Sequence, residues 1–223
     1  MEVFKNEISP HTIEIFKEHY KKYKDDKSVN DINLHEIDIR TRIFPTHKAW
    51  DEIKKICIKH FPSITDKEIY ANYQRQFKPT FMHVDEYGAY RESDTWTIII
   101  PLHTDTRLSV VIFKKIFNTN EDLQKFIINF PYETEKKCNN ISQLVPLQHT
   151  PNDWKNPENF LSDYLELDGV FYYNEGDYVL FDTNKLHVTS NFSILPEYKF
   201  KDLIQIHIGK SNRKGYDPFY RNK

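Results

Sequence analysis

Glycine and cysteine are scarce in this sequence, and no long apolar run interrupts it. Only 5 of the 223 residues are glycine while 15% are aromatic, which disfavours a disordered chain and indicates a packed core. The 2 cysteines, Cys57 and Cys138, are too few for a disulfide framework and lack metal-site spacing, which favours a reducing compartment. The longest apolar runs, near residues 98–102 and 110–113, have the length of strands and cannot span a bilayer.

An excess of charge of one sign is also lacking. The formal net charge is -2, so no overall basic bias argues for a nucleic-acid partner. The first residues contain no basic segment followed by an apolar run, so no signal peptide is predicted. Together these features predict a soluble, cytoplasmic protein without a clear nucleic-acid or membrane signal.

A helical N-terminal part is followed by a strand-rich remainder. Ser9 and Pro10 are typical of a helix start, and apolar residues then recur at helical spacing to about Lys24. A short strand near residues 37–43 and a second helix over residues 48–60 are expected next. From Ile69 onward, β-branched and aromatic runs broken by turn residues predict strands. The expected strands cover residues 69–77, 81–84, 95–102, 108–113, 177–182 and 201–208.

The pattern predicts one domain, because strands and helices do not alternate regularly and no repeat is present. A barrel or sandwich with helices packed outside fits this order of elements. Residues 139–158, polar and dotted with proline, are expected to pass over the surface near the barrel mouth. The expected parts are a helical support (1–68), a strand core (69–209) with an insertion at about 118–173, and a basic tail (210–223).

Two segments carry candidate metal ligands. In Phe-Met-His-Val-Asp-Glu-Tyr-Gly, His83 and Asp85 are two positions apart, so on a strand they project to the same side and can bind one ion together. In Gly-Asp-Tyr-Val-Leu-Phe-Asp-Thr-Asn-Lys-Leu-His, a turn glycine opens an apolar strand that runs into a loop presenting His187. Two histidines and one carboxylate leave three coordination positions open, which suits non-haem iron(II) and oxygen.

A rival pair, His103 and Asp105, has the same His-x-Asp spacing. The first pair is preferred, because residues 95–102 and 108–113 then become consecutive strands joined by a turn that contains His103. With the rival pair, residues 81–88 have no role. A His-x-Asp pair alone arises by chance, so the metal-site prediction depends on the joint occurrence with the later histidine.

These motifs resemble those of the 2-oxoglutarate/iron(II) oxygenase superfamily, in the style of its phytanoyl-CoA- and prolyl-hydroxylase-like microbial members. The resemblance covers about residues 73–209, and the Gly-Asp-Tyr-Val-Leu-Phe-Asp stretch is its most specific part. It implies a mainly β, α+β fold: a double-stranded β-helix (jelly-roll) barrel with the N-terminal helices packed outside. It also implies that His83, Asp85 and His187 bind Fe(II), and that 2-oxoglutarate serves as co-substrate in hydroxylating a small molecule or peptide.

One departure from the superfamily concerns the residue that binds the far carboxylate of 2-oxoglutarate. That residue is usually an arginine, or less often a lysine, on the strand after the distal histidine, and no arginine occurs there in this chain. Lys201 is the best candidate and Lys199 the second. A lysine lacks the guanidinium fork, so a hydroxyl partner is expected, with Tyr73 and Thr97 as candidates.

Lys201 is expected to point into the barrel. Lys201, Leu203, Gln205 and His207 share one strand face, and the opposite face is the more apolar and suits packing under the helices. Two other functions stay open. A cupin-like metal dioxygenase without 2-oxoglutarate would favour more histidine ligands, and a non-catalytic binding module would have lost the metal site.

Overall fold

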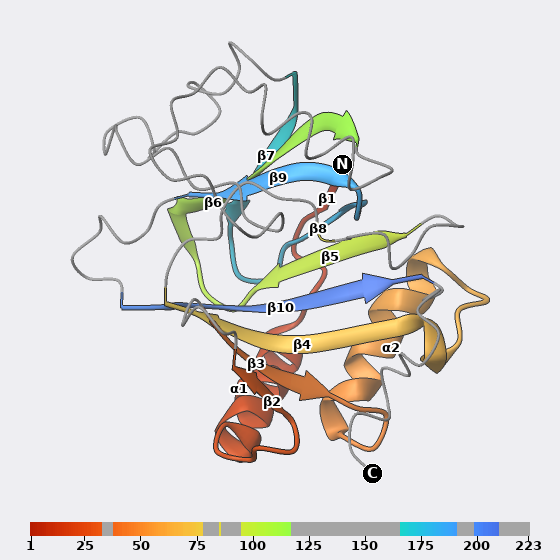
Figure 1. Cartoon of the computed structure of the whole chain (residues 1–223), viewed down its shortest axis with the longest axis vertical. Helices are drawn as coiled ribbons and strands as arrows, with labels where there is room; N and C mark the ends of the chain where they lie inside the picture. The colour runs from red at the N-terminus through yellow and green to blue at the C-terminus, as the bar shows by residue number, and fades with distance from the viewer. Residues whose placement is uncertain (33–37, 78–84, 86–94, 117–165, 191–198, 210–223) are drawn as a thin grey trace, which may run out of the picture.

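Two sheets and two helices make up the described part of this computed structural model, which comprises residues 1–32, 38–77, 85, 95–116, 166–190 and 199–209 (Figure 1). The larger sheet has the strand order β1-β8-β5-β10-β4-β3-β2, and the smaller sheet the order β7-β6-β9. The strands of the larger sheet are β1 (Glu2–Phe4), β2 (Asn30–Ile32), β3 (Asp38–Ile43), β4 (Ile69–Gln76), β5 (Trp96–Pro101), β8 (Tyr178–Asp182) and β10 (Lys201–Ile208). Those of the smaller sheet are β6 (Asp105–Ile116), β7 (Leu167–Tyr173) and β9 (Lys185–Thr189).

The chain passes back and forth between the two sheets. β5 lies in the larger sheet, β6 and β7 in the smaller, β8 in the larger, β9 in the smaller and β10 in the larger. The neighbouring strands pair in antiparallel fashion, as β10 does with both β4 and β5. This alternation winds the strands into a double-stranded β-helix whose two sheets face each other across an interior. The mainly β architecture expected from the sequence is therefore confirmed.

Both helices lie on the outer side of the larger sheet, at the positions that the sequence predicts (Figure 1). α1 (Pro10–Tyr23) begins after Ser9, whose Oγ accepts a hydrogen bond of 3.1 Å from the backbone N–H of Thr12. α2 (Lys48–His60) follows β3, and a short 3-10 helix, η1 (Asp66–Glu68), leads into β4. Neither helix in the described part of the chain is long and apolar enough to cross a membrane.

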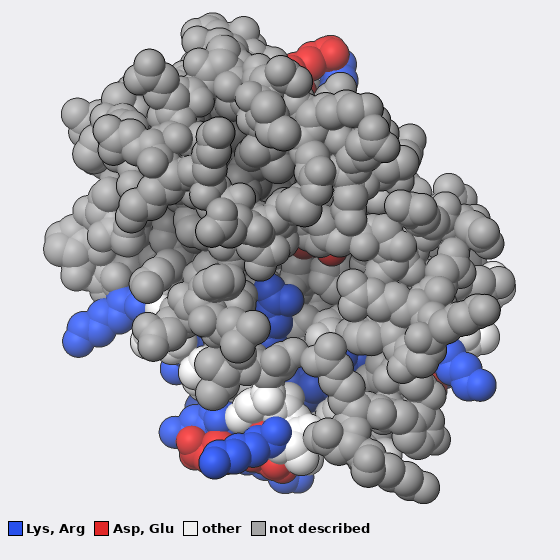
Figure 2. Space-filling model, viewed as in Figure 1, with Lys and Arg blue, Asp and Glu red and all other residues white. Residues whose placement is uncertain are grey.

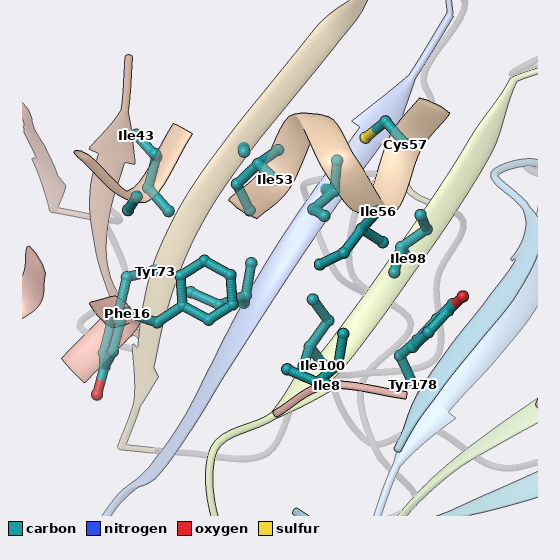
Figure 3. Packing of buried hydrophobic residues seen from close by; sticks show 14 of the residues in the cluster. Ile8, Phe16, Ile43, Ile53, Ile56, Cys57, Tyr73, Ile98, Ile100 and Tyr178 are labelled. Atoms are coloured by element: carbon teal, nitrogen blue, oxygen red, sulfur yellow. The ribbon is translucent and has the colours of Figure 1, made fainter. Parts of the chain in front are cut away.

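The helices bury an apolar core against the outer face of the larger sheet, and Figure 3 shows side chains of α2 directed at the strands below it. β5 and β10 contribute every second residue to this core, because alternate side chains of a strand project to opposite faces. The core includes Ile13, Phe16 and Tyr20 of α1, Ile53, Ile56 and Cys57 of α2, and Ile98, Ile100, Ile204 and Ile206 of the sheet.

The inner face of the larger sheet supplies the interior between the two sheets. Part of this interior is apolar, with Ile99, Leu203, Val179 and Phe181 of the larger sheet packed against Val110, Ile112, Phe171 and Tyr173 of the smaller. The remaining inward positions of β4 and β10 are polar. The fold therefore places a row of polar side chains in the interior, where they are shielded from water.

The structure differs from the sequence prediction in several local features. His187 lies within strand β9, which a turn joins to β8, and not in a loop. β7 is a core strand paired with β6, so the expected insertion ends before Leu167 rather than at Tyr173. β1 and β2 are too short to leave a periodic pattern in the sequence. The predicted strand 81–84, the excursion 139–158 and the tail 210–223 lie outside the described residues.

The helix-facing core predicts which aromatic residue stabilises the fold. Phe16 is completely buried between α1 and the sheet, so Phe16→Ala should lower the free energy of unfolding by about 3–5 kcal/mol. Ile58 on α2 is 40% exposed, and Ile58→Ala should change it by less than about 0.5 kcal/mol. Urea denaturation followed by circular dichroism measures both, and equal effects would contradict the assignment of this core.

Candidate metal centre

A carboxylate and an imidazole face each other in the interior. Oδ1 of Asp85 lies 3.6 Å from Nε2 of His187, and the two side chains are 5% and 2% exposed. His187 projects inward from β9, and the backbone N–H of Asp85 donates to the carbonyl of Thr183 in the turn before that strand, at 3.2 Å. Residues far apart in the sequence are thereby held together by a backbone hydrogen bond.

The orientation of the His187 ring leaves one nitrogen available to a ligand. Nδ1 lies 2.9 Å from the carbonyl oxygen of Lys185, so it carries a proton and donates it there, while Nε2 faces the carboxylate of Asp85. Burial lowers the pKa of His187, but Asp85 and the Lys185 carbonyl offset this and raise that pKa above its ordinary value. The same geometry suits a metal ion, which takes the place of the proton on Nε2.

Three neighbours from adjacent strands orient the Asp85 carboxylate. Oδ2 accepts a hydrogen bond of 2.9 Å from the hydroxyl of Thr97 on β5, and Oδ1 accepts one of 3.4 Å from Nε2 of Gln205 on β10. Nδ1 of His207 lies 4.0 Å from Oδ2 and 3.2 Å from the Thr97 hydroxyl. Burial, partly opposed by Asp85, lowers the pKa of His207 to about 4, so this ring is neutral at pH 7.

The described residues contain two of the three predicted ligands, Asp85 and His187, and place them together. The third, His83, lies outside the described residues. Within the described ranges no three His, Cys, Asp or Glu side chains form a group that could hold a metal ion. One buried oxygen donor and one buried nitrogen donor fit iron(II), which accepts both ligand types. The full triad stays a prediction because of its first member.

The rival ligand pair is engaged in other contacts. The carboxylate of Asp105 accepts hydrogen bonds from Nε and Nη2 of Arg107, at 3.0 and 2.7 Å, and the arginine side chain is 52% exposed. The ring of His103 stands edge-on to Tyr173, with centroids 6.0 Å apart. A carboxylate that already forms a bidentate ion pair with an arginine is a weaker candidate for a metal ligand than the buried Asp85.

Lys201 is completely buried at the start of β10 and lies on the same inner face as Gln205 and His207. Its Nζ donates to the hydroxyl of Tyr173 at 3.3 Å, and burial lowers the pKa of Lys201 to about 7. Lys199, the alternative anchor, is exposed. A buried amine of lowered pKa on the same strand face as the Asp85 contacts is suited to binding an anion that enters the interior.

The two hydroxyl partners proposed from the sequence occupy different faces. Tyr73 does not line the interior: its ring stacks on Tyr20 of α1, with centroids 4.6 Å apart, in the helix-facing core. The odd-numbered positions of β4 face the helices, which excludes Tyr73 from the site. Thr97 does face the interior, where it contacts Asp85 rather than Lys201.

Sequence reasoning missed the hydroxyl that does contact Lys201. Tyr173 comes from β7 in the opposite sheet, and Phe171 and Tyr173 are buried while Tyr172 between them is 48% exposed. All three residues are aromatic, so the sequence shows no alternation here, and only the structure reveals that Tyr173 faces inward. Gln205 was placed on the inner face but was given no role, and its contact with Asp85 depends on tertiary structure.

The buried Lys201 predicts a cost in stability. Because its pKa falls from 10.5 when unfolded to about 7 when folded, the unfolded chain binds more protons between these values, and stability should rise with pH there. Lys201→Met should raise the free energy of unfolding at pH 7 by roughly 2–4 kcal/mol and remove this pH dependence.

Urea denaturation at pH 7 and at pH 9 tests this expectation. Lys199→Met is the matched control, because the side chain of Lys199 is exposed and should change the free energy of unfolding little. A Lys201→Met variant with lower stability and an unaltered pH slope would show that the buried amine is charged and stabilising in the folded protein.

Comparison with known proteins gives matches in structure only. No protein-family model matches the sequence, and no curated protein matches it. A prolyl-4-hydroxylase from Pseudomonas putida superimposes with a TM-score of 0.50 and 8% identity, over 94% of this chain and 92% of that one. HygX from Streptomyces hygroscopicus, solved with nickel and 2-oxoglutarate bound, gives a TM-score of 0.54 and 10% identity, over 93% and 81%.

A third structure is the non-heme alpha ketoglutarate dependent carbocyclase SnoK from nogalamycin biosynthesis. It gives a TM-score of 0.53 and 10% identity, over 93% of this chain and 78% of that one. At such identities the likeness concerns the fold. The chain has the double-stranded β-helix fold of the 2-oxoglutarate/iron(II) oxygenases, as the resemblance in its sequence implies.

Proposed function

We propose that this protein is a non-haem Fe(II)- and 2-oxoglutarate-dependent oxygenase that hydroxylates a C–H bond of a small-molecule or peptide substrate. The observation that carries the proposal is the buried pair of Asp85 and His187, with Oδ1 and Nε2 3.6 Å apart inside a double-stranded β-helix. A second buried group, Lys201, supports the same conclusion, because it offers an amine to an anion from the same inner face.

His83, Asp85 and His187 would hold the iron. When bound, the metal supplies the activation of oxygen that accompanies oxidative decarboxylation of 2-oxoglutarate to succinate. The chain's own residues have supporting tasks. Thr97 and Gln205 hold the Asp85 carboxylate in position, and the carbonyl of Lys185 fixes the tautomer of His187. The apolar side chains between the sheets exclude water from the centre.

The spacing of residues along β10 suits the binding of 2-oxoglutarate between the Asp85–His187 pair and Lys201. Gln205 contacts Asp85, and Lys201 precedes it by four positions on the same inner face. Four residues of strand span about 13 Å along this face, which leaves room for a five-carbon dicarboxylate between the two groups. Lys201, with the hydroxyl of Tyr173 beside it, would therefore bind the far carboxylate of 2-oxoglutarate.

Structures with the same fold support a small-molecule substrate. HygX has been solved with nickel, 2-oxoglutarate and hygromycin B bound, and the epimerase SnoN with Fe3+, alpha ketoglutarate and nogalamycin RO. Their identities to this chain are 10% and 8%, so these compounds are not carried over. The chemical class of the substrate is argued below from the residues of this chain.

A second function is favoured by one specific observation. The imidazole of His207 lies 4.0 Å from Asp85, so a centre with an additional histidine is within reach of small side-chain movements. A cupin-like dioxygenase that does not use 2-oxoglutarate would use such a centre. The buried Lys201 has no task in that function, which is why the 2-oxoglutarate-dependent function is preferred.

If Asp85 is a metal ligand and Asp105 is not, replacing each of them should affect metal binding differently. Asp85→Ala should abolish binding of Mn(II), used as an air-stable substitute for Fe(II), because it removes a charged oxygen ligand from a buried centre. Asp105→Ala is the matched control and should bind Mn(II) like the parent, since Asp105 pairs with Arg107 at the surface. Electron paramagnetic resonance of free Mn(II) measures both, and the opposite pattern would assign the centre to the rival pair.

If Lys201 binds the far carboxylate of 2-oxoglutarate, its replacement should weaken binding of 2-oxoglutarate but not of the metal. Lys201→Met should weaken 2-oxoglutarate binding by about two to four decades, the range expected when one partner of a buried ion pair is removed, while Mn(II) still binds. Because the Lys201 amine must be protonated to bind a dianion, the Kd of the parent should rise as pH increases above about 7.

Isothermal titration calorimetry of the Mn(II)-loaded protein measures this Kd between pH 6 and pH 9. Lys199→Met should keep both the affinity and its pH dependence. Normal 2-oxoglutarate binding by Lys201→Met would place the anchor elsewhere. A parent protein that binds Mn(II) but not 2-oxoglutarate would favour the cupin-like function.

A further inference from the structure

β3 adds two arginines to the inner face of the larger sheet. It pairs with β4 so that Arg40 lies opposite Gln74 and Arg42 opposite Asn72. Directly paired residues of neighbouring strands project to the same side. The neighbouring residue of β3, Ile43, belongs to the helix-facing core, which places both arginines on the other, inner face.

A continuous set of contacts connects Arg42 to the proposed metal centre. Its guanidinium carbon lies 3.4 Å from the centre of the Tyr70 ring, and that ring lies 5.9 Å from the ring of His207. His207 in turn lies 4.0 Å from the carboxylate of Asp85. Burial is the main cause of the low pKa of His207, and the positive charges of Arg40 and Arg42 lower this pKa further.

Arg40 adds positive charge at the same place, although it is partly neutralised. Its Nε donates to Oδ2 of Asp38 at 3.0 Å, and Gln74 donates to the same oxygen. β3 thus brings two guanidinium groups to its inner face, and that of Arg40 is paired with Asp38. In the view of Figure 2, Lys and Arg atoms are visible near the centre of this face of the molecule.

Asn72 lies between these arginines and the metal centre, and its side chain is completely buried. Among the described residues, neither its Oδ1 nor its Nδ2 has a hydrogen-bond partner. Asn72 pairs with Arg42 on one side and with Gln205 on the other, and Oε1 of Gln205 also lacks a partner within the described ranges. A buried amide without partners costs roughly 1–3 kcal/mol, so such a group is a candidate contact for a polar ligand.

We propose that Arg42 and Asn72, assisted by the charge of Arg40, bind an anionic group, a carboxylate or a phosphate, of the primary substrate. The guanidinium offers paired donors to the anion, and Nδ2 of Asn72 donates beside it. This subsite differs from that of the co-substrate, because Lys201 lies on β10 whereas Arg42 lies two strands away on β3. The inference rests on the proposed function, in that the metal centre defines where the substrate reacts.

The test uses inorganic phosphate and acetate as separate probes of the Mn(II)-loaded protein with saturating 2-oxoglutarate. Bound Mn(II) shortens the relaxation time of nuclei in an anion held nearby, so the relaxation of the 31P of phosphate and of the acetate protons reports binding beside the metal. We expect at least one probe to bind in the parent. Preference for phosphate indicates a phosphate ester, and preference for acetate indicates a carboxylic acid.

Arg42→Gln and Asn72→Ala should each weaken that binding at least tenfold, whereas Arg42→Lys should give an intermediate loss. Arg107→Gln is the matched control, because Arg107 pairs with Asp105 at the surface, and it should behave like the parent. Thermal melting of each variant shows whether it is folded. The inference is overturned if neither probe binds to the parent, or if Arg42→Gln and Asn72→Ala, whichever is folded, bind as the parent does.

Calorimetry with phosphate and acetate in the absence of metal separates this inference from the proposed function. A parent that does not bind Mn(II) contradicts the oxygenase function. If it nevertheless binds an anion and Arg42→Gln loses that binding, the subsite stands without the metal. If it binds Mn(II) and 2-oxoglutarate but neither anion, the oxygenase function stands and the anionic substrate is excluded.

Discussion

The buried carboxylate of Asp85 imposes the strongest constraint on the interior of this protein. Ionised carboxylates are poorly tolerated away from water unless they are hydrogen-bonded or bound to a metal ion. Here Thr97, Gln205 and His187 surround Asp85, and they come from three strands in two different sheets. The β-helix has to close correctly before all of these partners are in place. Site geometry and fold are therefore specified by the same contacts.

β10 shows how one strand meets two opposite requirements. Its outward residues, Ile204, Ile206 and Ile208, pack under the helices, while Lys201, Gln205 and His207 face the interior. The pattern could be read from the sequence because three of the four outward residues are isoleucine. The bounds of β10 and α2, and the inward direction of Lys201, follow from such strict periodicity.

Elsewhere the sequence was less informative for physical reasons. β4 reads Ile-Tyr-Ala-Asn-Tyr-Gln-Arg-Gln, with aromatic residues on both faces, so Tyr73 could be assigned to the interior although it packs against α1. The hydroxyl beside Lys201 belongs to Tyr173 on the opposite sheet, and such a cross-sheet contact leaves no local pattern. The proximity of Asp85 and His187 could be predicted because both residues lie in recognisable motifs. The role proposed for Asn72 could not, because it depends on the lack of hydrogen-bond partners for its side chain among the described residues.

The short strands β1 and β2 at the two ends of the larger sheet have a consequence for solubility. Exposed sheet edges are templates on which other chains can add strands, and long flat edges promote aggregation. Each of these terminal strands spans only three residues, so the longer and more apolar strands β5, β8 and β10 lie inside the sheet. The strands added at the two ends of the sheet thus keep its most aggregation-prone strands away from other molecules.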